Sequence, residues 1–261
     1  MQLKPKKSLG QNFLHDKNII DKIIHASNIG PKDEILEVGP GTGNLTELII
    51  SQNPKKIDVI EKDKNLASNL EEKFLNKINI ITEDILRLPV EFYSKRNFLI
   101  LGNLPYNIST KILSTWCLNN KLSVSKMILM FQKEVAERII ADVNSKNYSR
   151  ITILSKWKFN IRKVTDVKPN SFFPKPKVHS TVLEFTPKKK IHNIEDPKNL
   201  EKITKVFFSQ RRKMIKKPMK QLFADYKIIA KKLNLDLSLR PQNISKDLYL
   251  EICKCYEDLN H

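Results

Sequence analysis

The tetrapeptide Asn103-Leu104-Pro105-Tyr106 places an amide, a restricted backbone carbonyl and an aromatic ring in consecutive positions. It follows the apolar run 98–101, which is typical of a buried strand. Because Pro105 favours an extended Leu104, the Leu104 carbonyl and the Asn103 side-chain carbonyl can both accept hydrogen bonds from one amino group. Tyr106 adds a flat face for a planar ring. The pattern predicts a site that holds a planar amine; the alternative is a strand-ending turn with a buried tyrosine.

A second set of residues predicts a nucleoside-binding site. The chain has six glycines, and the segment 37–46 (EVGPGTGNLT) contains three of them, Gly39 and Gly41 among them, directly after an apolar strand pattern. The G-x-G-x-G spacing does not fit the dinucleotide fingerprint G-x-G-x-x-G/A, which disfavours a nicotinamide dinucleotide. Glu61 closes the second strand pattern, where it could accept hydrogen bonds from both ribose hydroxyls of a nucleoside. Asp84 closes the third, where it could accept from an adenine amino group. Each acid alone would read as a helix N-cap. Together the features resemble the class I S-adenosylmethionine-dependent methyltransferases over residues 34–131.

Methyl transfer to an exocyclic amine would give the tetrapeptide 103–106 a chemical role. An adenine amine is a poor nucleophile, and two acceptors at its N–H groups would hold its lone pair toward a sulfonium methyl group. The sequence NLPY is similar to the N/D-P-P-Y/F motif of amino-group nucleic-acid methyltransferases. A base must leave its stack to enter such a pocket. The loop 169–180 offers Phe172 as the stacking residue and Phe173 as a packing residue, although both could belong to the core.

The whole chain then resembles the small-subunit ribosomal RNA adenine dimethyltransferases. The resemblance rests on six segments in order: KKSLGQNFLHD (6–16), EVGPGTGNLT, GNLPYNIST (102–110), FFPKPKVHS (172–180), FFSQRRKMIKK (207–217) and RPQNIS (240–245). It implies dimethylation at N6 of two neighbouring adenosines near the 3′ end of small-subunit (16S) ribosomal RNA. It also implies cofactor contacts from Asn12, Leu14, Gly39, Glu61, Asp84 and Asn103. Phe173 and Lys175 depart from the family pattern, in which small residues or proline are common.

Strand and helix patterns alternate along the first two thirds of the chain, which predicts a doubly wound, mostly parallel α/β sheet. The resemblance implies seven strands. Strand patterns cover 34–39, 56–63, 78–84, 97–103 and 126–131, and late strands cover 158–167 and 180–187. The strand pattern disappears after residue 187 and short helices are indicated over 197–257. We therefore predict a catalytic domain at 1–190, with a basic N-terminal segment at 1–17, and a small all-helical, basic RNA-binding domain at 191–261.

The formal net charge of +19 and the isoelectric point near 9.7 favour a polyanionic partner, although a lysine-rich codon bias alone could produce this charge. Clustering of the basic residues in one segment would favour a polyanionic partner over codon bias. The segment 205–220 carries seven Lys or Arg and no acid, where a solvated helix face is the alternative. We predict RNA contacts from Arg211, Arg212, Lys213, Lys216 and Lys217.

The hydropathy, the N-terminal sequence and the cysteines narrow the class of protein. No apolar run reaches the roughly 18 residues of a membrane span, no secretory signal is recognisable, and three cysteines form no metal-ligand pattern. We expect a cytoplasmic, monomeric enzyme that acts on a pre-assembled small ribosomal subunit, with no metal. Two other hypotheses are a large-subunit RNA adenine methyltransferase of the erythromycin-resistance type, which usually has N-I-P-Y, and a non-enzymatic RNA-binding relative of the same fold.

Overall fold

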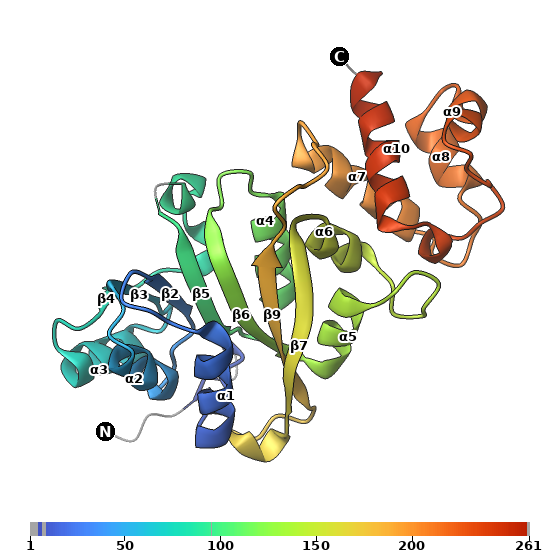
Figure 1. Cartoon of the computed structure of the whole chain (residues 1–261). Helices are drawn as coiled ribbons and strands as arrows, with labels where there is room; N and C mark the ends of the chain where they lie inside the picture. Colours follow the sequence, from blue (N-terminus) through green and yellow to red (C-terminus); the bar gives the residue numbers. More distant parts are fainter. Residues whose placement is uncertain (1–4, 7–8, 95, 260–261) are drawn as a thin grey trace. The chain divides into compact units, whose positions relative to one another are not determined.

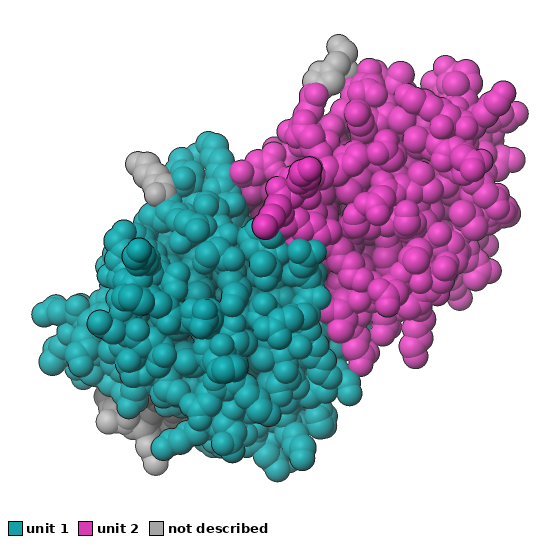
Figure 2. Space-filling model, viewed as in Figure 1, with its two compact units in different colours: residues 1–115, 121–136, 160–187 teal, residues 116–120, 137–159, 188–261 magenta. Residues whose placement is uncertain are grey.

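The computed structural model describes residues 5–6, 9–94 and 96–259 (Figure 1). The chain divides into two compact units, which Figure 2 shows in different colours. The first comprises residues 1–115, 121–136 and 160–187, and the second comprises 116–120, 137–159 and 188–261. The sequence placed the boundary near residue 190. The chain does change units at 187–188, but the second unit also takes in two earlier segments that the sequence did not separate.

The first unit is built on a sheet whose seven described strands follow the order β4-β3-β2-β5-β6-β9-β7. The strands are β4 (Asn79–Ile81), β3 (Lys56–Ile60), β2 (Glu34–Val38), β5 (Phe98–Asn103), β6 (Val124–Gln132), β9 (Ser180–Pro187) and β7 (Phe159–Val167). Neighbours from β4 to β6 are parallel, and β9 is antiparallel to β6. The predicted seven-stranded, mostly parallel α/β sheet is confirmed.

The central strands are buried on both faces. In β5, residues 98–102 are all buried, as expected for a parallel strand covered by helices on both sides. Apolar side chains of β2, β3, β5 and β6 share one core cluster with α1 (Lys17–Ser27) and α2 (Asn44–Ser51), which therefore cover one face. The remaining helices that begin in this unit are α3 (Lys64–Phe74), α4 (Ser109–Leu118) and α5 (Lys133–Ile140), with short 3-10 turns η2 (Ile85–Arg87), η3 (Val90–Tyr93) and η4 (Pro169–Ser171).

A two-stranded antiparallel sheet joins the N-terminal segment to the loop before β9. Its strands are β1 (Phe13–Leu14) and β8 (Phe172–Phe173), with Phe13 opposite Phe173 and Leu14 opposite Phe172. Successive side chains of a strand point to opposite faces, so the pairing places Leu14 and Phe172 in the core cluster. Phe172 is 3% exposed and Phe173 is 62% exposed. The expectation that Phe173 packs in the interior is therefore wrong.

The second unit is helical in its C-terminal part, as the sequence predicts. It contains α6 (Arg150–Lys158), α7 (Pro197–Phe208), α8 (Lys216–Leu222), α9 (Tyr226–Lys232), the 3-10 turn η5 (Pro241–Asn243) and α10 (Lys246–Asp258). The rings of Phe207 and Tyr249 meet edge to face with centroids 5.3 Å apart in its core. Cys253 and Cys255 are buried residues of α10, and the described residues contain no cluster of metal-ligating side chains.

The described helices include none that is long and apolar enough to cross a bilayer. Residues 1–4 and 7–8 of the expected basic N-terminal segment lie outside the described residues.

Candidate active site

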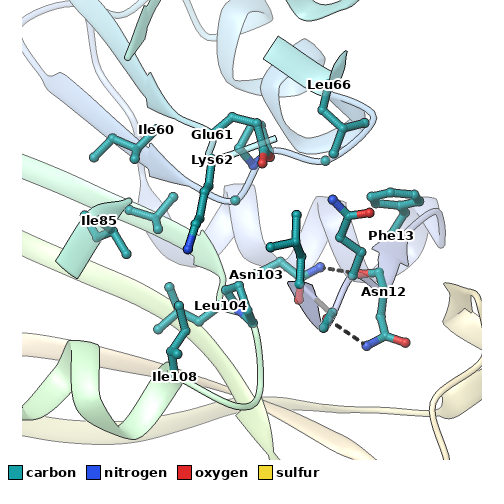
Figure 3. A pocket seen from close by; sticks show the side chains of 18 of the residues that line it. Asn12, Phe13, Ile60, Glu61, Lys62, Leu66, Ile85, Asn103, Leu104 and Ile108 are labelled. Atoms are coloured by element: carbon teal, nitrogen blue, oxygen red, sulfur yellow. Dashed lines mark hydrogen bonds between the residues drawn. The ribbon is translucent and has the colours of Figure 1, made fainter. Parts of the chain in front are cut away.

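The predicted site residues of the first unit converge on one pocket at the carboxyl ends of β2, β3 and β5 (Figure 3). This edge of an open parallel sheet is where ligands bind in doubly wound folds. All of the predicted cofactor residues line the pocket, as do all of the predicted catalytic residues except Phe172. They are Asn12, Leu14, Gly39, Gly41, Glu61, Asp84, Asn103, Leu104, Pro105 and Tyr106.

The glycine loop after β2 brings backbone close to the pocket. Gly39 and Gly41 have φ angles of +71° and +59°, in the left-handed region that favours glycine. A Cβ atom on Gly39 would lie 3.1 Å from the Asn103 carbonyl oxygen, and one on Gly41 would lie 2.7 Å from the Phe13 ring. Both positions therefore exclude a side chain, and the loop can present its backbone to a ligand.

Two carboxyl groups are buried at the ends of β2 and β3. Glu61 is 8% exposed, and burial raises its pKa, while its Oε1 accepts a hydrogen bond of 2.8 Å from the Asp63 N–H. Glu37 is 1% exposed, and burial raises its pKa to about 7, while a hydrogen bond from the Thr46 side chain acts in the opposite direction. Sequence reasoning missed Glu37, because an acid inside an apolar strand pattern gives no periodic signal.

Asp84 has the N-cap role that the sequence offered as the alternative to ligand binding, and it also lines the pocket. It is the N-cap of η2, where its Oδ1 accepts from the Leu86 N–H at 2.9 Å, and its Oδ2 lies 3.0 Å from Lys62 Nζ. Burial opposes ionisation, but these hydrogen bonds outweigh it and lower the pKa of Asp84. The carboxylate is therefore charged, and its remaining acceptor capacity faces the pocket that Asp84 lines.

The Asn103 side chain is oriented by the N-terminal segment. Its Nδ2 donates a hydrogen bond of 2.8 Å to the Asn12 carbonyl oxygen, which Figure 3 draws as a dashed line. This bond engages the side-chain amide nitrogen of Asn103, and the side-chain carbonyl oxygen, Oδ1, is left as the acceptor at the pocket. Asn12 is itself held by a 3.2 Å bond from its Nδ2 to the Gly10 carbonyl.

Tyr106 is held by a partner that the sequence did not predict. Its hydroxyl lies 2.5 Å from the Ser180 hydroxyl, at the start of β9, and burial raises the pKa of Tyr106. The tyrosine is therefore neutral at physiological pH, and its ring is fixed at one end. Phe172 does not line the pocket, because its ring packs in the core cluster.

The five basic residues predicted to contact RNA differ in their exposure and in their contacts with the rest of the protein. Arg212, Lys213, Lys216 and Lys217 are exposed. Arg211 is half-buried, and its guanidinium donates to the carbonyl oxygens of Ser145 and Lys146. Arg211 therefore holds the loop 142–148 as well as carrying charge.

The sheet order, the glycine loop and the acids at the strand ends define a Rossmann-like methyltransferase. Comparison with known proteins agrees. The family model described as ribosomal RNA adenine dimethylase matches residues 2–258. The chain is 52% identical to ribosomal RNA small subunit methyltransferase A of Pelagibacter ubique over 99% of both chains, and 39% identical to the same-named protein of Malacoplasma penetrans over 97% of this chain and 92% of that one. The chain belongs to the ribosomal RNA adenine dimethylase family.

Solved structures agree with this assignment. A dimethyladenosine transferase from Plasmodium falciparum superposes with a TM-score of 0.80 and 26% identity, covering 95% of this chain and 98% of that one. The 23S rRNA methyltransferase ErmE superposes with a TM-score of 0.69 over 94% of this chain and all of its own, and at 22% identity it shows the fold alone.

Proposed function

We propose that this enzyme transfers methyl groups from S-adenosylmethionine to N6 of two adjacent adenosines near the 3′ end of small-subunit (16S) ribosomal RNA, as a step in building the small subunit. The observation that carries the proposal is the Asn103 amide. Its nitrogen donates to the Asn12 carbonyl, which leaves the side-chain carbonyl oxygen of Asn103 to accept from an exocyclic amine, and we propose the Leu104 backbone carbonyl as the second acceptor.

The pocket fits the cofactor that the family implies. Gly39 and Gly41 leave no room for side chains of their own, and Glu37 places a buried carboxyl group in the pocket lining, where a cationic ligand would stabilise its ionised form. We propose that Glu61 accepts hydrogen bonds from the ribose and Asp84 from the adenine amine, with further contacts from Asn12, just before β1, and from Leu14 in β1. When bound, the cofactor supplies a methyl group on a cationic sulfonium.

The protein's part in the reaction is to position and polarise the target amine. The Asn103 and Leu104 carbonyl oxygens accept from its two N–H groups and hold its lone pair toward the methyl group. Pro105 fixes the Leu104 carbonyl, and the Tyr106 ring supports the face of the base. The chain needs no strong base for this role, because an amine that has accepted a methyl group would be cationic and acidic and would release its proton to water before a second transfer.

A second aromatic on the other face of the base is an open part of this proposal. The sequence predicts that Phe172 stacks there, and this stays a prediction. Its 3% exposure favours a supporting role, in which the ring packs in the core beside Leu14, its partner in the β1–β8 pair, and helps to hold that pocket-lining residue in place.

We further propose that the helical C-terminal region binds RNA phosphates through Arg211, Arg212, Lys213, Lys216 and Lys217. We also propose that the enzyme acts in the cytoplasm, as a monomer, on a pre-assembled small subunit. The exposed side chains of four of these residues and the net charge of +19 support the phosphate contacts. Arg211 contributes its charge while it holds the loop 142–148.

The test is to offer unmethylated small and large ribosomal subunits separately, with a labelled methyl donor, and to identify the modified nucleoside after digestion. We expect N6,N6-dimethyladenosine in the small-subunit RNA alone. Label confined to the large subunit would assign the resistance-type activity instead, and absence of label in both would overturn the proposed substrate.

A further inference from the structure

Phe173 is an exposed aromatic side chain next to the active-site wall. It is 62% exposed, although its neighbour Phe172 is buried in the core. A single exposed apolar residue on a surface is ordinary, so its exposure alone carries no argument. The argument rests instead on the loop that contains Phe173 and on the contacts of that loop.

The loop 173–179 is anchored to the pocket at both ends. At its start, Phe173 pairs with Phe13, and Phe13 lines the pocket beside the glycine loop. At its end, Ser180 binds the hydroxyl of Tyr106 at 2.5 Å. Phe173 does not line the pocket. The loop therefore runs along the edge of the site that receives the target, without entering it.

The exposed side chains of this loop are basic as well as aromatic. Lys175, Lys177 and His179 are all exposed, and neither lysine forms an ion pair with any of the described residues. Pro174 and Pro176 restrict the backbone between them, which lowers the entropy that is lost when a ligand orders the loop. A stiff segment that combines an aromatic face with unpaired cations is typical of surfaces that bind single-stranded nucleic acid, where bases stack and phosphates pair.

We propose that the loop 173–179 binds the RNA strand beside the target adenosine, with Phe173 stacking on a flanking base and Lys175 and Lys177 contacting phosphates. This proposal rests on the proposed function, since it takes RNA as the substrate. The flanking base is the partner because the target base occupies the pocket lined by Asn103, Leu104 and Tyr106, which Phe173 does not line. The loop thus serves as a second substrate contact, separate from the groups that touch the reacting amine.

The test measures binding of the full-length protein to unmethylated small subunits over a range of salt concentrations. Phe173→Ala should weaken binding roughly 5- to 150-fold, the effect of losing one base–aromatic stack, with the salt slope unchanged. Lys175→Gln with Lys177→Gln should lower the slope by about 1.4 to 1.8. Matched controls are Leu75→Ala, at a residue 70% exposed after α3, and Lys32→Gln with Lys77→Gln, at exposed lysines that precede β2 and β4 at the opposite edge of the sheet. The controls should bind as the wild type does.

Steady-state kinetics separate this role from the alternatives. A flanking contact predicts a raised KM for subunits, an unchanged kcat and an unchanged calorimetric affinity for the cofactor. Wild-type affinity in both loop variants would overturn the proposal. A fall in kcat with full affinity in Phe173→Ala would place Phe173 on the target base instead. Weaker binding with an unchanged slope in the lysine variant would indicate a protein surface and would also overturn it. If the wild type binds subunits through this loop but transfers no methyl group, the proposed function fails and the RNA contact stands.

Discussion

Glu37 is a carboxyl group that the fold buries near the carboxyl end of β2. Burial raises its pKa from 4.5 to about 7. Between these two values the folded protein binds more protons than the unfolded chain does. The stabilisation that comes from the protonated form is therefore complete below pH 4.5 and is lost as the pH rises through 7.

We expect Glu37 to lower the free energy of unfolding of the cofactor-free protein by about 3 kcal/mol between pH 4.5 and pH 7. Glu37→Gln cannot ionise, so this component should be missing from its pH profile. Urea denaturation at several pH values would measure both curves. Identical pH profiles for the wild type and the variant would show that Glu37 is not the group responsible.

At the scale of elements, the segment before α1 is tied to the loop after β3 by one carboxylate. Asp63 accepts hydrogen bonds from Lys6 Nζ at 2.8 Å and Gln11 Nε2 at 3.1 Å, and its own N–H donates to Glu61. Gln11 precedes Asn12, whose carbonyl orients Asn103. These contacts connect Glu61 to Asn103 through the N-terminal segment.

We expect Asp63→Ala to weaken cofactor binding by about tenfold, since it removes two charge-assisted hydrogen bonds that hold pocket residues. Asp63 also caps α3, so the matched control is Asp196→Ala, which removes the cap of α7 in the second unit. Both variants should lose about 1 kcal/mol of stability from the cap. Equal cofactor affinities in the two variants, measured by calorimetry, would contradict the role of Asp63 in the pocket.

The elements differ in how far the sequence could predict them. The strands of the main sheet and helix α1 carry strong periodic patterns, and the glycines with Glu61 and Asp84 mark the strand ends. The pairing of β1 with β8 could not be predicted, because two-residue strands have no period and their partners lie far apart in sequence. That pairing decides which of Phe172 and Phe173 faces the core, so the prediction that Phe173 packs in the interior is wrong. Ser180 and Asp63 became visible only through their partners.

At the scale of the whole molecule, the excess positive charge fits a polyanionic substrate. Some of the basic side chains stabilise the fold through hydrogen bonds, and others are exposed and available to bind a ligand. Arg211 donates to backbone carbonyls of the loop 142–148, whereas Arg212 is exposed. We expect Arg212→Gln to lower the salt slope of binding to small subunits by about 0.7 to 0.9 with little change in stability.

The neighbouring variant supplies the comparison. Arg211→Gln should lower the melting temperature as well, because it leaves carbonyls of that loop without their donor. Salt titrations of subunit binding and thermal melts of both variants would measure the two effects. A destabilised Arg212→Gln, or an Arg211→Gln protein as stable as the wild type, would contradict this division.

The most direct measurement compares the single-turnover rate of methyl transfer to small subunits in wild-type and Asn103→Ala enzymes, alongside the calorimetric affinity of each for the cofactor. Asn107→Ala, at the same pocket edge, is the matched control. Loss of one acceptor from the target amine should cost about 2.7–4 kcal/mol in the chemical step, by analogy with the loss of one oxyanion-hole donor. We therefore expect a rate 100- to 1,000-fold lower for Asn103→Ala, with a much smaller change in cofactor affinity and a near-normal rate for the control. A near-normal rate in Asn103→Ala would contradict the claim that this segment holds the reacting amine.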